Sequence, residues 1–176
     1  MTRNEFESNL QSLVGERIKA IQYYEVEYEN GEVLWNYDPR FDSLDYGLDL
    51  VMESGLTKGI IWGSEFCQYG ISMVSQSLSL ELRGGRKIDV SNTSRWKDII
   101  GREIENVKII WSWEKEVGLF KKKIYYPQDL ILTFSGEKSV FISAMEIREG
   151  SHFGMADNIT VFFNKNDAEK FIEFKA

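Results

Sequence analysis

The segment LVGERIKAI at residues 13–21 recurs in altered form as IIGREIENV at residues 99–107, an offset of 86. Similar segments at a fixed spacing indicate that one structural unit is built twice. The repeat therefore predicts two copies of a short helix followed by a β-meander. Six positions coincide at this offset: Leu10, Leu13, Val14, Gly15, Ile18 and Ile21 align with Trp96, Ile99, Ile100, Gly101, Ile104 and Val107.

Two further matches follow in the same order. YGLDLVM at residues 46–52 matches YPQDLIL at residues 126–132 with an offset of 80, and Glu65 matches Glu146 with an offset of 81. These matches give internal repeats at about 4–82 and 94–165. Since a unit of about 80 residues buries little surface alone, we expect both copies to form a single domain, 1–176, with pseudo-symmetry.

Strand patterns dominate both copies, so the predicted fold class is mainly β with few short helices (α+β) in antiparallel meanders. The two halves form either two packed sheets or one continuous curved sheet. Asn4 and Ser94 are predicted to cap the two short helices, and a C-terminal helix is expected at about 166–174. The apolar parity differs between the copies after Tyr23 and Ile109, which predicts a β-bulge or a changed partner face in one copy.

Three local patterns predict further elements. Residues 18–28 alternate so that Tyr24 and Val26 would face the core and Glu25 the solvent. Asn30 and Gly31 predict a hairpin turn after this strand. Residues 77–82 are predicted to form another strand, followed by a hairpin turn at RGGRK.

The charge balance limits the partners of the protein. Its 176 residues carry 28 acidic and 21 basic side chains, for a net charge of −7. Such a field repels phosphate backbones, so we expect no nucleic-acid partner and instead a basic protein. No apolar run approaches the length of a membrane span and the first residues lack a signal-peptide pattern, so we expect a cytoplasmic protein without a membrane partner.

The sequence contains no motif for catalysis or cofactor binding. His152 and Cys67 are the only residues of their types, and neither has a nucleophile signature beside it. We therefore expect a loop histidine and an inert buried cysteine. One histidine and one cysteine are too few for a typical zinc site. No phosphate-binding glycine loop is present, and no cofactor is expected.

The segment from Trp35 to Tyr46 is the predicted partner-binding site. Aromatic anchors surrounded by charge are typical of interfaces. Its acids continue to Asp49 at spacings of four, three and four, which on a helix would form a cation site. Pro39 and Gly47 disfavour that helix, so a loop or a single helical turn is expected. The predicted partner-binding residues are Trp35, Tyr37, Asp38, Phe41, Asp42, Asp45 and Tyr46; the acids considered for a cation are Asp38, Asp42, Asp45 and Asp49.

An alternative site is a cleft between the two repeats, lined by Trp62, Glu65 and Glu146. The two glutamates are a symmetric pair that could perform acid–base chemistry. The same symmetry also follows if both residues only cap strand ends. In this alternative the protein binds a small molecule or is a hydrolase-like enzyme.

Several strings together carry a family resemblance: LVGERIKAIQYYEVEY, IIWGSEF, IIGREIENVKIIWSW, YYPQDLILTFSG and MADNITVFFN. They resemble small acidic bacterial proteins, most of them uncharacterised, some of which are similar to immunity proteins of contact-dependent or polymorphic toxin systems. The resemblance implies a cytoplasmic, non-enzymatic binder that neutralises a toxin domain. It supplies no catalytic residue.

Overall fold

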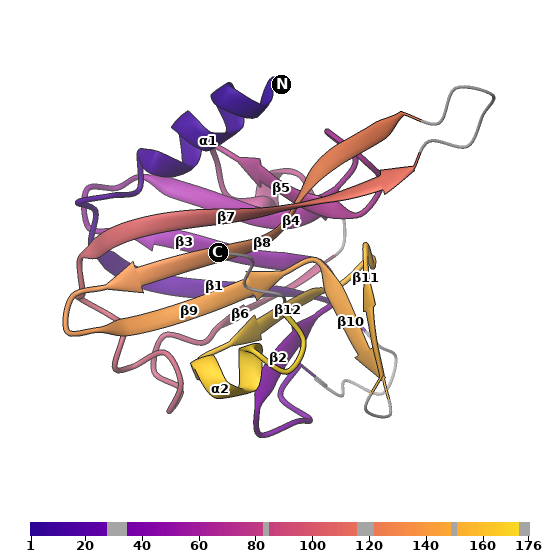
Figure 1. Ribbon diagram of the computed structural model, residues 1–176. Helices are drawn as coiled ribbons and strands as arrows, with labels where there is room; N and C mark the ends of the chain where they lie inside the picture. The colour runs from indigo at the N-terminus through magenta and orange to yellow at the C-terminus, as the bar shows by residue number, and fades with distance from the viewer. Residues whose placement is uncertain (28–34, 83–84, 116–121, 149–150, 173–176) are drawn as a thin grey trace.

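The computed structural model describes residues 1–27, 35–82, 85–115, 122–148 and 151–172. Its strands form two five-stranded antiparallel sheets and one hairpin (Figure 1). The first sheet has the order β5 (Gly70–Val74), β4 (Thr57–Gly63), β3 (Gly47–Met52), β1 (Ile18–Val26) and β6 (Gly85–Asp89). The second has the order β2 (Phe41–Leu44), β12 (Ile159–Phe162), β9 (Lys138–Ser143), β8 (Lys123–Phe134) and β7 (Ile104–Lys115). The hairpin consists of β10 (Met145–Arg148) and β11 (Ser151–Gly154).

The mainly β, antiparallel prediction is confirmed, and the arrangement is two packed sheets. One buried cluster takes side chains from both sheets, for example Leu48 and Leu50 of β3 and Leu130 and Leu132 of β8. A second cluster lies on the other face of the second sheet, where Phe141 and Phe162 alternate with residues of the first cluster. This face is covered by α2 (Lys165–Ala168) and the residues that follow it (Figure 1).

The helix α1 (Arg3–Gln11) packs on β7. Its N-cap is Thr2, in a capping box with Glu5, and not the predicted Asn4. Phe6 and Leu10 are buried, whereas Val14 is exposed. α1 thus anchors the chain start to the shared core.

The two halves use the same neighbour order within their sheets. β1, β3, β4 and β5 pair in succession, as do β7, β8, β9 and β12. The segments of the sequence repeat also bond to each other. The amide of Gly15 donates to the Ile104 carbonyl (2.9 Å), and the amide of Gly101 donates to the Ile18 carbonyl (2.8 Å). Both glycines have a positive φ, a conformation that favours glycine.

The predicted β-bulge is confirmed in the second copy. The β7–β8 register shifts between Ile110 and Trp111, whereas β1 pairs with β3 without interruption from Ala20 onward. β7 and β8 continue beyond the bulge as a two-stranded ribbon that projects from the body (Figure 1). The two halves therefore differ in the part of the β7–β8 pairing that lies beyond the bulge.

Several local predictions are wrong. Glu25 is buried and Val26 is partly exposed, the reverse of the predicted alternation, because both faces of β1 are covered. Residues 77–82 contain the 3₁₀ helix η1 (Leu78–Leu80) and no strand, and the predicted turn at RGGRK begins with residues 83–84, which lie outside the described residues. The region after Ser94 forms turns and no helix.

Two further predictions concern the C-terminal helix and the turn after β1. The predicted C-terminal helix at 166–174 is limited to Lys165–Ala168, with turns after it. The predicted turn at Asn30 and Gly31 lies outside the described residues. Within the described part of the chain, no helix has the length and apolar character needed to span a membrane.

Candidate functional site

The predicted partner-binding loop contains the edge strand β2, so the loop prediction is wrong for Phe41–Leu44. Phe41 is buried on the outer face of the second sheet. Asp42 is fully buried and accepts a 2.7 Å hydrogen bond from the Tyr23 hydroxyl and an ion-paired bond from Arg95. Burial raises the pKa of Asp42 to about 6, although both partners act in the opposite direction. Phe41 and Asp42 thus hold the fold and present no surface to a partner.

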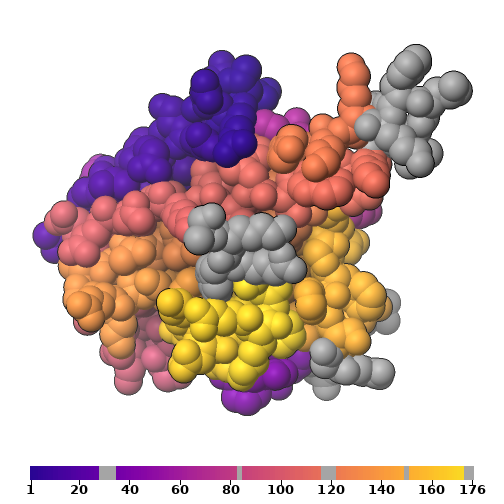
Figure 2. Space-filling model, in the orientation of Figure 1, coloured from indigo at the N-terminus to yellow at the C-terminus, as the bar shows by residue number. Residues whose placement is uncertain are grey.

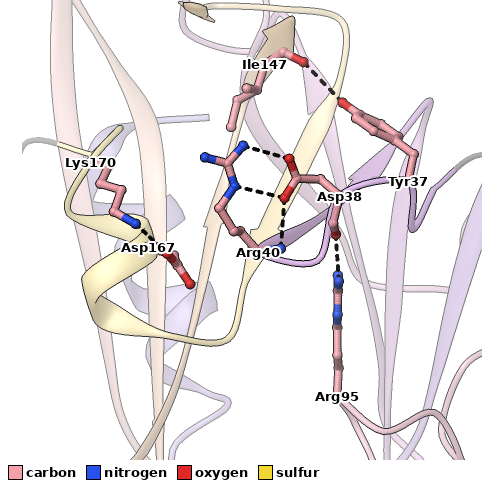
Figure 3. A network of polar contacts seen from close by, with 7 residues as sticks. All are labelled: Tyr37, Asp38, Arg40, Arg95, Ile147, Asp167 and Lys170. Atoms are coloured by element: carbon pink, nitrogen blue, oxygen red, sulfur yellow. Dashed lines mark hydrogen bonds and ion pairs between the residues drawn. The ribbon is translucent and has the colours of Figure 1, made fainter. Parts of the chain in front are cut away.

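The start of the segment is fixed by the polar network of Figure 3. The Arg40 guanidinium donates to both carboxylate oxygens of Asp38 (2.9 and 2.7 Å) and holds the pKa of Asp38 below its ordinary value. Arg95 donates to the Asp38 carbonyl (2.7 Å). The Tyr37 hydroxyl donates to the Ile147 carbonyl of β10 (3.1 Å), while 57% of Tyr37 is exposed. Tyr37 is therefore an anchored aromatic surface residue.

The four acids considered for a cation have separate partners. Asp49 is fully buried and accepts bonds from the Tyr24 and Ser77 hydroxyls and the Leu78 amide. Asp45 accepts the Val26 amide at 3.0 Å. In the described ranges, no three acidic, histidine or cysteine side chains gather in a way that could hold a metal ion. Each acid thus belongs to a different part of the hydrogen-bond network.

A cavity of about 290 Å³ lies where the two halves meet, and we call it the acidic cavity. It brings together two predicted partner-binding residues, Asp45 and Tyr46, and two residues of the alternative cleft, Trp62 and Glu146. Glu65 is exposed in the connection between β4 and β5 and is not among the lining residues. The full lining is Val26, Asp45, Tyr46, Trp62, Glu146, Arg148, Asp157 and Asn158.

Hydrogen bonds fix the walls of the acidic cavity. The Trp62 indole donates to the Asp45 carbonyl (2.8 Å) and packs edge-on against Tyr69. Arg148 donates to Glu146 at 2.5 Å. The described residues of the lining therefore include three carboxylates and one guanidinium, which is paired with Glu146.

Glu25 adds a further carboxyl beside this cavity. Only 5% of Glu25 is exposed, and its Oε1 has no hydrogen-bond partner among the described residues. Its Oε2 accepts the amide of Asp45, a cavity residue, at 3.4 Å. Burial and, second, the nearby Asp45 carboxylate raise the pKa of Glu25 to about 9. Since buried polar atoms are normally paired, this orphan oxygen needs an explanation.

No family model, curated protein or solved structure matches the chain. The function of this protein is therefore inferred from its own geometry.

Four residues in or beside the acidic cavity were not predicted from the sequence. Arg148, Asp157 and Asn158 come from the β10 strand and the approach to β12, far in sequence from β2. Glu25 follows an alternation that places it outside, so its burial gave no signal. The other two groups considered for chemistry lie elsewhere: Cys67 is half-buried and His152 is on β11, and no hydrogen bond joins them in the described chain.

Proposed function

We propose that the protein is a non-enzymatic protein-binding module whose acidic cavity receives a lysine or arginine side chain of a basic partner. The observation that carries the proposal is the convergence of Asp45, Glu146 and Asp157 around one cavity, whose described lining residues include one cation, Arg148, paired with Glu146. A site with excess negative charge binds cations and repels anions.

The aromatic walls support the same ligand chemistry. Tyr46 and Trp62 line the cavity beside the carboxylates, and a cation is attracted to the face of an aromatic ring. The hydrogen bond from the Trp62 indole to the Asp45 carbonyl holds the ring before a partner arrives. Such preorganisation reduces the entropic cost of binding.

The surroundings of the cavity suit a protein rather than an isolated side chain. Tyr37, which is bonded to the backbone of β10, exposes its ring next to the strand that supplies Glu146 and Arg148. Exposed tyrosines are frequent anchors in interfaces. The net charge of −7 would also speed the encounter with a basic protein. Together with the resemblance of the sequence, these features support an immunity-type role, in which the protein covers a basic toxin domain.

Affinity capture from the native host tests the proposal with three versions of the tagged full chain. The cavity variant carries Asp45→Asn, Glu146→Gln and Asp157→Asn. The matched control removes the same charge at exposed sites elsewhere, by Glu53→Gln, Glu105→Gln and Glu137→Gln. We expect one basic protein to bind wild type and control, to elute with salt, and to be lost from the cavity variant. That protein should also be toxic when produced without this chain. Equal capture by the cavity variant would overturn the site, and a harmless partner would overturn the immunity role.

A second candidate is a small-molecule-binding protein that uses the same cavity. It is favoured by the presence of Trp62 and Glu146 in one concave lining. In this case purified wild type would bind small organic cations with the same dependence on Glu146, and no protein would be captured.

We also propose that the two halves are an internal duplication with pseudo-symmetry. Support comes from the shared neighbour order of the strands and from reciprocal hydrogen bonds whose donors and acceptors both differ by 86 positions. The first register shift falls at Ile18 in one ladder and at Ile104 in the other, again 86 apart.

A further inference from the structure

The β-bulge that distinguishes the second half creates a separate concave site. Asp129 pairs with Ile110 and Pro127 with Trp111, so Gln128 is left without a partner in the ladder. Such an extra residue re-aims its neighbours and is frequent next to functional sites. The Gln128 amide nitrogen donates to the Ala144 carbonyl (2.6 Å), and its oxygen accepts the Met155 amide (3.3 Å).

We call the resulting space the bulge cavity. Its volume is about 260 Å³, just below the range of about 300–1,000 Å³ that is usual for sites of drug-sized ligands. β7, the β10–β11 hairpin and the C-terminal segment enclose it, and Figure 2 shows the yellow C-terminal segment beside that hairpin and beneath β7. The lining is Ile110, Trp111, Ser112, Tyr126, Gln128, Asp129, Met145, His152, Gly154, Phe171 and Ile172.

Asp129 is the one acidic group among the described residues of this lining. Only 4% of the residue is exposed. The Ser143 hydroxyl donates to its Oδ1 at 2.5 Å, and no other hydrogen bond to Asp129 occurs in the described chain. Burial raises the pKa of Asp129 to about 7, which the bond from Ser143 only partly offsets. Among the described residues of the lining there is no lysine or arginine that would neutralise it.

Aromatic rings form rigid apolar walls around this carboxyl. Ile110, Met145 and Ile172 of the second cluster supply the apolar side chains beside it. Phe171 stacks on Phe162 at 5.7 Å and meets the His152 ring edge-on, also at 5.7 Å. The site therefore combines one buried acceptor with fixed apolar surfaces.

We propose that the bulge cavity binds a small organic cation, an aromatic or branched alkyl ammonium whose charged head pairs with Asp129. Its apolar body lies against Ile110, Phe171 and Ile172. The ammonium supplies the hydrogen-bond donors that Oδ2 of Asp129 lacks, and the partner charge that a buried carboxylate requires. This site is distinct from the acidic cavity and does not rest on the proposed function.

The probe is 2-phenylethylammonium, and 2-phenylethanol is its neutral analogue. Both are titrated at pH 8 into the ¹⁵N-labelled full chain and followed by nuclear magnetic resonance and calorimetry. We expect saturable binding of the ammonium, with the largest shifts at the backbone amides of Ile110 and Gly154. The alcohol should bind at least tenfold more weakly. Shifts that are confined to other regions, or equal affinity for both probes, would overturn the proposal.

Two variants test whether the Asp129 carboxylate is the group that pairs with the ammonium. Asp129→Asn keeps the shape of the side chain and its bond from Ser143, so we expect the variant to fold and to bind the ammonium at least tenfold more weakly than wild type. Glu105→Gln, an exposed site that lines neither cavity, should leave this affinity unchanged. Wild-type affinity in Asp129→Asn would contradict the assignment, as would an equal loss in Glu105→Gln.

Discussion

Two kinds of buried carboxyl coexist in this protein, and they differ in how many donors surround them. Asp42 lies in β2 and Asp49 in β3, and each accepts bonds from two or three groups. Asp129 accepts one hydroxyl, and one oxygen of Glu25 accepts none among the described residues. The former pair is satisfied by the protein, whereas the latter pair lies beside cavities.

We infer from this difference that the carboxyls with several donors hold the fold, whereas those with few donors mark places where a ligand can bind. An unsatisfied buried carboxyl costs free energy in the folded state, so the fold is more stable without its charge. A carboxyl that is paired with enough donors holds the fold together, and its removal leaves those buried donors without an acceptor. The predictions below separate the two kinds by the sign of their effect.

The largest effect is expected for Asp42→Ala. The change leaves the Arg95 guanidinium without its carboxylate partner and the buried Tyr23 hydroxyl without its acceptor. Removal of one partner of a buried pair costs about 3–5 kcal/mol, and we expect this loss in the free energy of unfolding, measured in urea at pH 7.5. Asp42→Asn, which preserves the shape, should lose less. A loss below about 1 kcal/mol would remove Asp42 from the structural class.

Glu25→Gln should act with the opposite sign. Because the pKa of Glu25 in the folded state is about 9, above its ordinary 4.5, its contribution to stability is fully present below pH 4.5 and declines up to pH 9. The variant should match wild type at pH 4.5 and exceed its free energy of unfolding by on the order of 2–4 kcal/mol at pH 9. Denaturant unfolding across this range measures the difference. A variant that is less stable than wild type at pH 9 would contradict the placement of Glu25.

Asp129→Asn should also stabilise the protein, by a smaller amount. The folded pKa of about 7 exceeds the ordinary 3.8, so stability from this group is lost between pH 3.8 and 7. We expect a gain of about 1–3 kcal/mol at pH 8 and no gain at pH 3.8. Thermal unfolding at both pH values checks this result. A gain that is independent of pH would indicate a packing effect instead.

The smallest effect is expected for Arg17→Gln, which breaks an exposed ion pair with Glu103 (2.7 Å) between the repeated segments. Exposed pairs contribute less than about 1 kcal/mol. Urea unfolding in low and high salt should show a small loss that disappears in salt. A loss comparable with that of Asp42→Ala would show that charge burial does not separate the two classes.

Much of the fold could be predicted from the sequence where a pattern reflects local chemistry. The mainly β, antiparallel fold and the change of pairing after Ile109 follow from the period-two patterns of the strands. Burial of Glu25 could not be predicted, because the aromatic residues on both faces of β1 are buried, and Glu25 shares the face of Ile21 and Tyr23, which pack in the first cluster. Nor does spacing reveal that a short segment such as β2 joins the sheet of the other half.

The candidate site was predictable only in parts. Asp45, Tyr46, Trp62 and Glu146 were selected in two separate sets, because the sequence contains no information that the halves place them in one cavity. The bulge cavity had a signal in the parity change, but the parity did not show that Asp129 would lose its donors there. Both sites form only through contacts between segments that are distant in the sequence.

The most direct test of the central contrast is a pH titration of the side-chain carboxyl carbons of the full chain by ¹³C nuclear magnetic resonance. The account predicts that Asp129 titrates near pH 7 and Glu25 near pH 9, and that 2-phenylethylammonium lowers the pKa of Asp129 alone. Titration of both groups near pH 4 would contradict the claim that this protein leaves two carboxyls buried without sufficient partners.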